Sequence, residues 1–308
     1  MKNYYRVMLG EQSVFAEQCF AGNFIGTDFE IAQNLTGKLP EEMRLFNKEF
    51  IPVLIAVRPD KSKVSAGLAC GALWKVSKGI KRGETVLCPD GKGFYRAGEV
   101  SGDYTYQPGE ILPHRRPVHW LGKVIDREEM SAELKKSAGS LNTVCDLTDH
   151  HAEIERLLGE LPVPSAAPAD PTVEDPGAFA MEKHLEEFLV ENWTQTELGK
   201  EFDIYEVDGV RVGQQFETDT GRLDILAISK DRKTLLVVEL KKGRASDAVV
   251  GQALRYMGYV QEVLAEAGQS VRGVIIALED DQRIRRALAM VPSIVFYRYE
   301  VTFKLVKA

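Results

Sequence analysis

Two short apolar runs separated by a polar turn place the strongest constraint on how this chain folds. The runs are Leu223–Ile228 and Leu235–Leu240, and the turn between them is Ser229–Lys233. Runs of this length, rich in aliphatic and β-branched residues and bounded by turn residues, are typical of buried strands. The sequence therefore predicts a buried β-hairpin in the C-terminal half of the chain.

Each predicted strand carries one acidic residue that breaks its apolar pattern. Asp224 lies in the first strand and Glu239 in the second, and Lys241 follows on the same face as Glu239. A buried carboxylate is costly unless it is paired or binds a metal. Two carboxylates on adjacent strands can hold a hard divalent cation, and a lysine beside them can orient water or neutralise charge on a phosphate. The alternative is a salt-bridged pair in the hairpin core.

The ordered motifs Gly221-Arg222-Leu223-Asp224 and Glu239-Leu240-Lys241 resemble those of the PD-(D/E)xK nuclease superfamily. The residues of these motifs look most like those in the C-terminal domain of the NucS-type endonucleases, and the resemblance covers about residues 181–308. The family pattern adds an acid on the first helix, supplied here by Glu186, and a Gln with a Tyr four residues later, supplied by Gln252 and Tyr256. Arg222-Leu223 replaces the literal Pro-Asp, a departure that is usual in the NucS branch.

The resemblance implies an α/β restriction-endonuclease-like domain with a mixed sheet flanked by helices. It implies a magnesium ion, replaceable by manganese, held by Asp224, Glu239 and the backbone carbonyl of Leu240, with Glu186 completing the shell through a water. The implied catalytic residues are Glu186, Asp224, Glu239, Lys241 and Gln252. From the residues alone, Glu182 could take the place of Glu186, and Gln252 could be a polar residue at a helix–sheet seam.

The charge balance shapes the expected DNA contacts. A formal net charge of −7 argues against a nucleic-acid binder that uses its whole surface, but it permits a local basic track. We expect Arg222, Lys242, Arg244 and Tyr256 to contact DNA. We expect the basic residues of the 229–233 turn to be ordinary solvated charges.

Composition indicates a globular protein. With 308 residues, 44% hydrophobic and 28% charged, the chain has room for two ordinary domains. Its four cysteines form no CxxC pair and are expected to be apolar fillers in a reducing compartment. The sequence has no run of 18 apolar residues and no signal-peptide pattern at its start, so we expect a cytoplasmic protein with no membrane partner.

A proline-rich stretch divides the chain. Residues 161–178 contain five prolines, which prevent regular structure and favour an extended linker. The expected organisation is a base-reading domain over 1–125, a helical connector over 126–160, the linker over 161–178 and the nuclease domain over 179–308.

Residues 1–125 read as mixed, strand-rich structure. Expected strands cover 4–9, 23–26, 83–89, 93–100 and 114–121, and expected helices cover 13–20, part of 39–57 and 65–74. The motifs Gly22–Gly26, Gly83–Val86, Gly98–Tyr104 and His114–Trp120 resemble the PUA-like modules, specifically the EVE- and YTH-like group fused to modification-dependent restriction enzymes. This resemblance implies an α+β barrel with a pocket for a flipped, often modified base.

A flipped base needs stacking faces and hydrogen bonds to its edge. The candidates for this base pocket are four aromatic residues for the faces and two polar residues for the edge: Trp74, Tyr104, Tyr106, Trp120, Asn23 and Asp28. The alternative is that these aromatic residues belong to the barrel core.

Further elements are expected in the C-terminal half. An amphipathic helix should begin at Met181, with Leu185, Phe188 and Leu189 on one face, and a hairpin should turn at Asp208-Gly209. A second helix should run from Ser246 or Asp247 to about Gly268. The remaining expected elements are a strand over 271–277, a helix over 281–290, and strands over 294–299 and 301–305.

Together these features predict a magnesium-dependent DNA endonuclease, directed to modified DNA by the N-terminal module in restriction or defence. The alternatives are a mismatch or branched-DNA repair nuclease and a non-catalytic nucleic-acid-binding sensor. Because cutting both strands requires two active sites, we expect a homodimer acting on double-stranded DNA.

Overall fold

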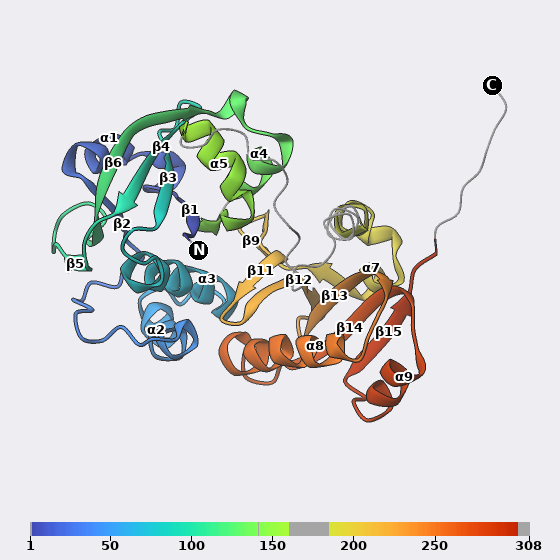
Figure 1. The fold of residues 1–308 in the computed structure, drawn as a ribbon. Coiled ribbons are helices and arrows are strands. Elements are labelled where there is room, and N and C mark those ends of the chain that lie inside the picture. The colour runs from blue at the N-terminus through green and yellow to red at the C-terminus, as the bar shows by residue number, and fades with distance from the viewer. Residues whose placement is uncertain (1, 141, 160–184, 301–308) are drawn as a thin grey trace, which may run out of the picture. The chain divides into compact units, whose positions relative to one another are not determined.

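The chain divides into two units, Met1–Ala167 and Pro168–Ala308, which we call the N-terminal and C-terminal units (Figure 1). The structure is a computed structural model that describes residues 2–140, 142–159 and 185–300. The linker expected over 161–178 lies outside the described residues, as do Glu182 and the strand expected over 301–305.

A seven-stranded sheet forms the centre of the N-terminal unit. Its order is β2-β6-β4-β3-β1-β7, with β5 beside β6. Strands β1 and β3 are parallel, and the other neighbours are antiparallel. The strands are β1 (Tyr4–Val7), β2 (Phe24–Thr27), β3 (Thr85–Pro89), β4 (Phe94–Val100), β5 (Thr105–Tyr106), β6 (His114–Asp126) and β7 (Val144–Asp146). Among the described residues this sheet is a half-barrel, and the closed barrel expected from sequence is not found.

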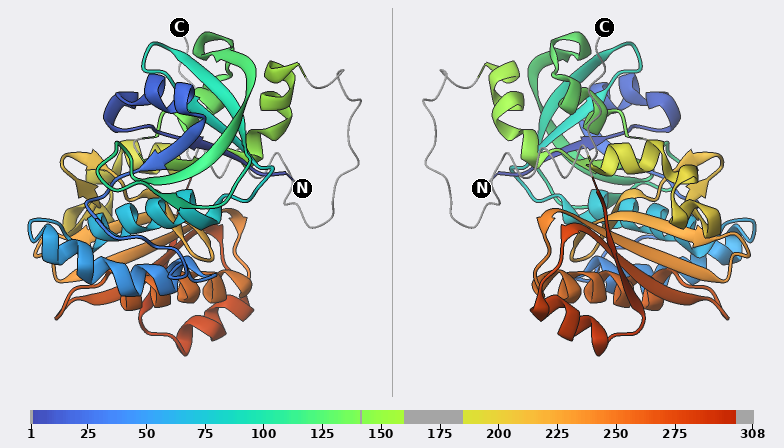
Figure 2. Two further views of the ribbon diagram at one scale, coloured as in Figure 1. Left: turned by 90° about the vertical axis from the view of Figure 1, so that its left-hand side faces the viewer. Right: turned by 90° about the vertical axis from the view of Figure 1, so that its right-hand side faces the viewer.

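Alternating side chains on this sheet bury two apolar clusters. On β3, Val86 and Cys88 join the cluster that includes Phe20 of α1, whereas Leu87 joins the cluster that includes Leu134 of α4. This is the period-2 pattern of a strand that is buried on both faces. Figure 2 shows the curved sheet with helices on both sides. The helices are α1 (Ala16–Gly22), α2 (Met43–Val57), α3 (Lys63–Trp74), α4 (Ala132–Ala138) and α5 (His151–Leu158).

The segment expected to be a helical connector contributes to the core of the N-terminal unit. Strand β7 pairs with β1 in the antiparallel register Tyr5↔Asp146, so the segment is not purely helical. Ile154 of α5 is fully buried beneath the sheet. Sequence reasoning missed β7 because a three-residue strand has no periodicity of its own and forms only when β1, distant in the chain, pairs with it.

A six-stranded mixed sheet forms the centre of the C-terminal unit. Its order is β11-β12-β13-β14-β15, with β8 beside β12. Strands β13, β14 and β15 are parallel, and β11, β12 and β13 are antiparallel. The strands are β8 (Phe202–Ile204), β11 (Gln214–Thr218), β12 (Gly221–Ser229), β13 (Thr234–Arg244), β14 (Ser270–Glu279) and β15 (Ile294–Arg298). The predicted hairpin is confirmed as β12 and β13, and so is the mixed sheet.

Helices cover both faces of this sheet (Figure 1). A helix over 185–191 and α7 (Glu197–Glu201) pack on one face, where Trp193 and Leu198 meet Leu236 and Val274. Helix α8 (Ala248–Tyr259) covers β13 and β14 from the other face and ends in a π-helical turn, Val260–Leu264, which is earlier than the expected end near Gly268. Helix α9 (Gln282–Ala289) is capped by Asp281, whose carboxylate accepts hydrogen bonds from the Arg283 and Ile284 N–H groups.

Two local expectations in this unit were wrong in detail. Phe188 is 66% exposed, because Glu186, Val190 and Trp193, spaced four and three residues apart, set the buried face of the helix instead. The turn at Asp208-Gly209 is present, with φ of 52° and 78°. It joins only β9 (Glu206–Val207) and β10 (Val210–Arg211), since the flanking strands β8 and β11 pair with β12 instead.

Candidate active site

The register of β12 and β13 brings the two predicted acids together. Ile225 pairs with Val238, so Asp224 and Glu239 occupy the next opposed positions and face the same side of the sheet. The carboxylate of Asp224 accepts a hydrogen bond from the Leu240 N–H, with 2.7 Å between Oδ2 and N. Glu239 is 1% exposed. Lys241, half-buried and two residues further along β13, shares the face of Glu239.

Helix α8 approaches the same acids with Gln252 and Tyr256. Gln252 hydrogen-bonds to Tyr256, which is 5% exposed. Burial raises the pKa of Tyr256, and the nearby charges of Glu239 and Asp224 raise it further, against the opposing effect of the Gln252 hydrogen bond. A methyl group on Gly221 would lie 2.8 Å from the Tyr256 hydroxyl, so glycine at the start of β12 makes this close approach possible. Tyr256 is thus largely buried beside the two acids.

Glu186 joins the cluster through two glutamines that sequence reasoning missed. Gln214 Nε2 donates to Glu186 Oε1 at 2.6 Å. Gln215 Nε2 donates to Glu186 Oε2 and also to Asp224 Oδ1 at 3.3 Å. Glu186 is 5% exposed. The sequence signal for these contacts is a pair of consecutive glutamines before Phe216. That pattern alone does not distinguish residues that bind Glu186 from ordinary strand residues.

The donor set suits magnesium held by two carboxylates. Mg²⁺ is usually bound by one or two carboxylates and keeps several waters, and Asp224 and Glu239 offer such oxygens on adjacent strands. Within the described ranges there is no cluster of three or more His, Cys, Asp or Glu side chains placed to share a metal. Glu186 is therefore not placed with Asp224 and Glu239 as a direct third ligand in this conformation.

The residues expected to contact DNA lie at the ends of β12 and β13. Arg222 lies 3.7 Å from Glu217, its cross-strand neighbour on β11. Arg244, with a side chain 63% exposed, lies 3.6 Å from Asp281. Lys242 is half-buried, and its backbone carbonyl accepts a hydrogen bond from the Tyr299 hydroxyl. These neighbours leave Arg244 as the most accessible of the three cations.

The structure brings only part of the proposed base pocket together, around His114. Trp120 is half-buried and packs edge-on against Phe20, with 5.0 Å between the ring centroids, and Trp74 Nε1 donates to the Pro40 carbonyl at 3.0 Å. Asn23 precedes β2 and Asp28 follows it, so the strand separates them by roughly 15 Å. The contact of Trp120 with Phe20 agrees with the alternative that the aromatic residues pack with the core of the N-terminal unit.

Tyr104 and Tyr106 instead flank a buried histidine, His114. Tyr104 Oη lies 2.8 Å from His114 Nδ1, and His114 Nε2 lies 2.8 Å from the Ile31 carbonyl. Because a carbonyl only accepts, Nε2 carries the proton and Nδ1 accepts from the Tyr104 hydroxyl. Burial lowers the pKa of His114, so the ring stays neutral. The network anchors the 31–35 segment, since Tyr104 Oη also accepts from the Leu35 N–H at 3.2 Å.

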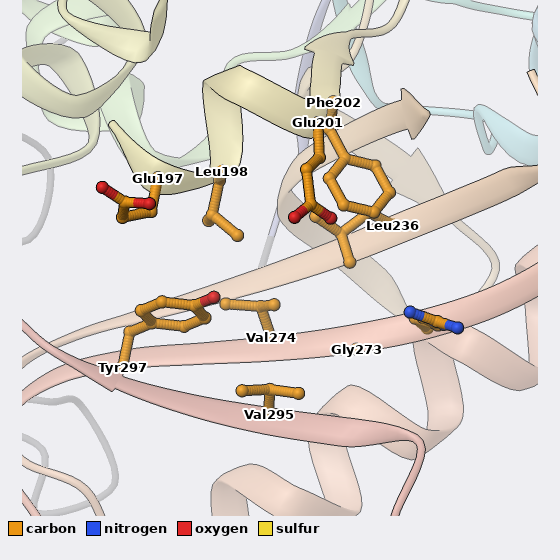
Figure 3. A pocket seen from close by; sticks show the side chains of 10 residues that line it. Glu197, Leu198, Glu201, Phe202, Leu236, Gly273, Val274, Val295 and Tyr297 are labelled. Atoms are coloured by element: carbon orange, nitrogen blue, oxygen red, sulfur yellow. The ribbon is translucent and has the colours of Figure 1, made fainter. Parts of the chain in front are cut away.

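A pocket of about 140 Å³ lies on the opposite face of the C-terminal sheet. Its lining includes Leu198, Phe202, Leu236, Val274 and Tyr297, and Figure 3 shows these side chains around it. Leu236 and Glu239 are three residues apart on β13 and point to opposite faces. This pocket is therefore separate from the carboxylate site.

The C-terminal unit is thus a mixed sheet with helices on both faces that carries Asp224 and Glu239-x-Lys241 on neighbouring strands. Residues 181–291 match the family described as the Endonuclease NucS C-terminal domain, so the C-terminal unit carries a NucS-type domain. Residues 5–148 match a family described as a Domain of unknown function (DUF8426), which does not identify a PUA-like module.

Three solved structures show similarity to the chain. "Structure of EndoMS-dsDNA2 complex" is 17% identical, with 68% of this chain and 62% of that chain covered and a TM-score of 0.32. A repair endonuclease from Pyrococcus abyssi is 17% identical, with coverage of 69% and 66% and a TM-score of 0.31. EndoMS in its apo form is 25% identical, with coverage of 42% and 49% and a TM-score of 0.30.

The present chain thus spans less than two thirds of each of these structures. No curated protein matches it. In the part of the chain that the structure describes, no helix has the length and apolar character needed to span a bilayer.

Proposed function

We propose that this protein is a metal-dependent endonuclease that hydrolyses phosphodiester bonds in DNA. The observation that carries the proposal is the placement of Asp224 and Glu239 side by side on β12 and β13, with Lys241 on the same face, in a domain that matches the NucS C-terminal family. Glu239 is buried and Asp224 is half-buried beside it, and keeping two carboxylates together away from water is costly without a cation to neutralise them.

Asp224, Glu239 and the Leu240 carbonyl would hold the magnesium ion. When bound, the ion supplies Lewis-acid stabilisation of charge on the phosphate and lowers the pKa of a bound water. The Leu240 N–H fixes the orientation of Asp224, so the carboxylate keeps its second oxygen, Oδ1, on the side of Glu186 and Gln215.

Lys241 would orient the attacking water and neutralise charge that develops on the scissile phosphate. Gln252 and Tyr256 close the α8 side of the site, and Gln252 would hydrogen-bond the water or a phosphate oxygen. Tyr256 is protonated at neutral pH, as tyrosine ordinarily is, so its hydroxyl would be available as a hydrogen-bond donor in the site.

Double-stranded DNA is the proposed partner, contacted through phosphates by Arg222, Lys242 and Arg244. The match of residues 181–291 to the NucS C-terminal family supports mismatched or branched DNA as one substrate class. The resemblance of the N-terminal unit to PUA-like modules supports modified DNA as the other. Of the proposed pocket residues, Tyr104 and Tyr106 meet at His114, and base reading by the N-terminal unit stays part of this proposal.

The test is a cleavage panel with the complete chain in magnesium or in excess chelator. The panel contains unmodified, base-modified, mismatched and flapped DNA of the same length. Metal-dependent cleavage of one class supports the proposal and identifies the substrate. Binding without cleavage of any member would favour a non-catalytic sensor, and cleavage in chelator would contradict metal dependence. Sedimentation of the active protein tests the proposed homodimer.

A further inference from the structure

Gln215 has an unusual backbone for its place in a strand. It lies in β11 between Gln214, which pairs with Ile225, and Phe216, which pairs with Leu223. Its φ is 49°, in the left-handed region that residues other than glycine seldom adopt. Strained backbone of this kind is often found where function requires a particular side-chain direction.

The kink changes where the side chain points. In a regular strand, consecutive side chains face opposite sides of the sheet. Here Gln214 and Gln215 both donate to the same carboxylate, Glu186, one to each oxygen. The left-handed conformation of Gln215 is the local reason why two neighbours reach one partner.

The Gln215 amide also connects Glu186 to Asp224. Its Nε2 group donates to Glu186 Oε2 and to Asp224 Oδ1, the latter at 3.3 Å. The other oxygen of Asp224 accepts from the Leu240 N–H. Asp224 is therefore held from both sides, by the amide of β11 and the backbone of β13. A carboxylate has about four lone-pair positions, so it can accept both hydrogen bonds and still bind a cation.

We propose that Gln215 is a positioning residue that sets the orientation of Asp224 for the divalent cation. This inference rests on the proposed function. Glu186 acts through Gln215, because its buried carboxylate fixes the amide and the amide in turn fixes Asp224. Gln214 contacts Glu186 in the same way but makes no contact of this kind with Asp224, so the two adjacent glutamines have different roles.

The same contacts also allow the opposite interpretation, in which the Gln215 side-chain amide occupies the position of the cation and competes with it. The two readings predict opposite changes when the amide is removed. If the amide orients the ligand, its loss weakens metal binding, and partners of metal ligands typically contribute about 10- to 100-fold in affinity. If the amide competes, its loss strengthens metal binding.

The experiment is calorimetric titration of the complete protein with Mg²⁺ and with Mn²⁺, without DNA. Gln215→Met keeps the length of the side chain and introduces no new backbone preference, but it removes the amide N–H groups that donate hydrogen bonds. Gln214→Met is the matched control. We expect Gln215→Met to raise the Kd about 10- to 100-fold and Gln214→Met to change it less than about 3-fold. Cleavage by Gln215→Met should recover at saturating metal, which a general folding defect would not allow.

Melting in chelator shows whether each variant is folded. If Gln215→Met is unfolded, Gln215→Asn replaces it, since Asn tolerates the left-handed backbone but is too short to span both carboxylates. An unchanged or lower Kd for the folded variant overturns the inference and leaves the proposed function intact. Absence of metal binding by the unaltered protein contradicts the proposed function itself, and the inference with it.

Discussion

The carboxylate of Asp224 accepts a hydrogen bond from the backbone N–H of Leu240, at 2.7 Å across the junction of β12 and β13. This contact joins the two halves of the candidate site, because Leu240 lies between Glu239 and Lys241 on β13. The position of the acid on one strand is thereby tied to the acid and the lysine on the other. A one-residue slip of register would move Asp224 to the opposite side from Glu239.

Replacing Lys241 should slow chemistry without unfolding the protein. We expect Lys241→Met to lower the rate of DNA cleavage at saturating metal and DNA by about 100-fold or more, because a positioned group that orients water or moves a proton contributes at least that much. Single-turnover cleavage measures it. Lys230→Met is the control, since Lys230 is exposed in the 229–233 turn. Equal rates for both variants would remove Lys241 from the mechanism.

Gly221→Ala should destabilise the C-terminal unit through Tyr256. The new methyl group would lie 2.8 Å from the Tyr256 hydroxyl, and the φ of Gly221, 134°, is unfavourable for alanine. We expect a loss of about 1 to 3 kcal/mol in the free energy of unfolding. Tyr256→Phe removes the clashing oxygen, so the double variant should recover part of the loss in a double-mutant cycle. Strictly additive effects would show that the two residues do not interact.

Acid should weaken the N-terminal unit through His114. Because burial lowers the pKa of His114 below its ordinary 6.5, the neutral ring is favoured in the folded state. The stabilisation is complete above pH 6.5 and is lost as pH falls below 6.5 toward the lower folded value. Urea unfolding at several pH values measures this dependence. His114→Asn should flatten it, whereas His119→Asn, at an exposed position, should not.

Arg6 should be essential for the stability of the N-terminal unit. It is fully buried on β1 and donates to the backbone carbonyls of Ala138, Ser140 and Thr143, which lead into β7. Arg6→Met keeps the apolar bulk but deprives these carbonyls of their donor, with an expected cost of about 3 kcal/mol. Chemical denaturation measures the change. A loss below about 0.5 kcal/mol would mean that water or another donor replaces the guanidinium.

The sequence predicted the parts of the fold that depend on local pattern. The β12–β13 hairpin follows from two apolar runs and a turn, and its register places Asp224 beside Glu239 without further information. The mixed sheet and α8 were also anticipated.

The features that were missed depend on contacts between distant residues. Strand β7 exists because β1 pairs with it, and Phe188 is exposed because Trp193 and Val190 fill the core in its place. The role of Gln215 depends on a left-handed backbone that no local propensity favours. Of the aromatic residues proposed for a base pocket, Tyr104 and Tyr106 meet at His114, whereas Trp74 and Trp120 make separate contacts, a division that sequence spacing could not reveal.

The central claim is that Asp224 and Glu239 hold a divalent cation. Anomalous X-ray scattering from crystals of the protein soaked in manganese tests it most directly. The account predicts a manganese peak at about 2.0 to 2.2 Å from a carboxylate oxygen of each residue, at a distance usual for small hard cations. Crystals of protein that cleaves DNA in manganese, but with no peak between these two carboxylates, would contradict it.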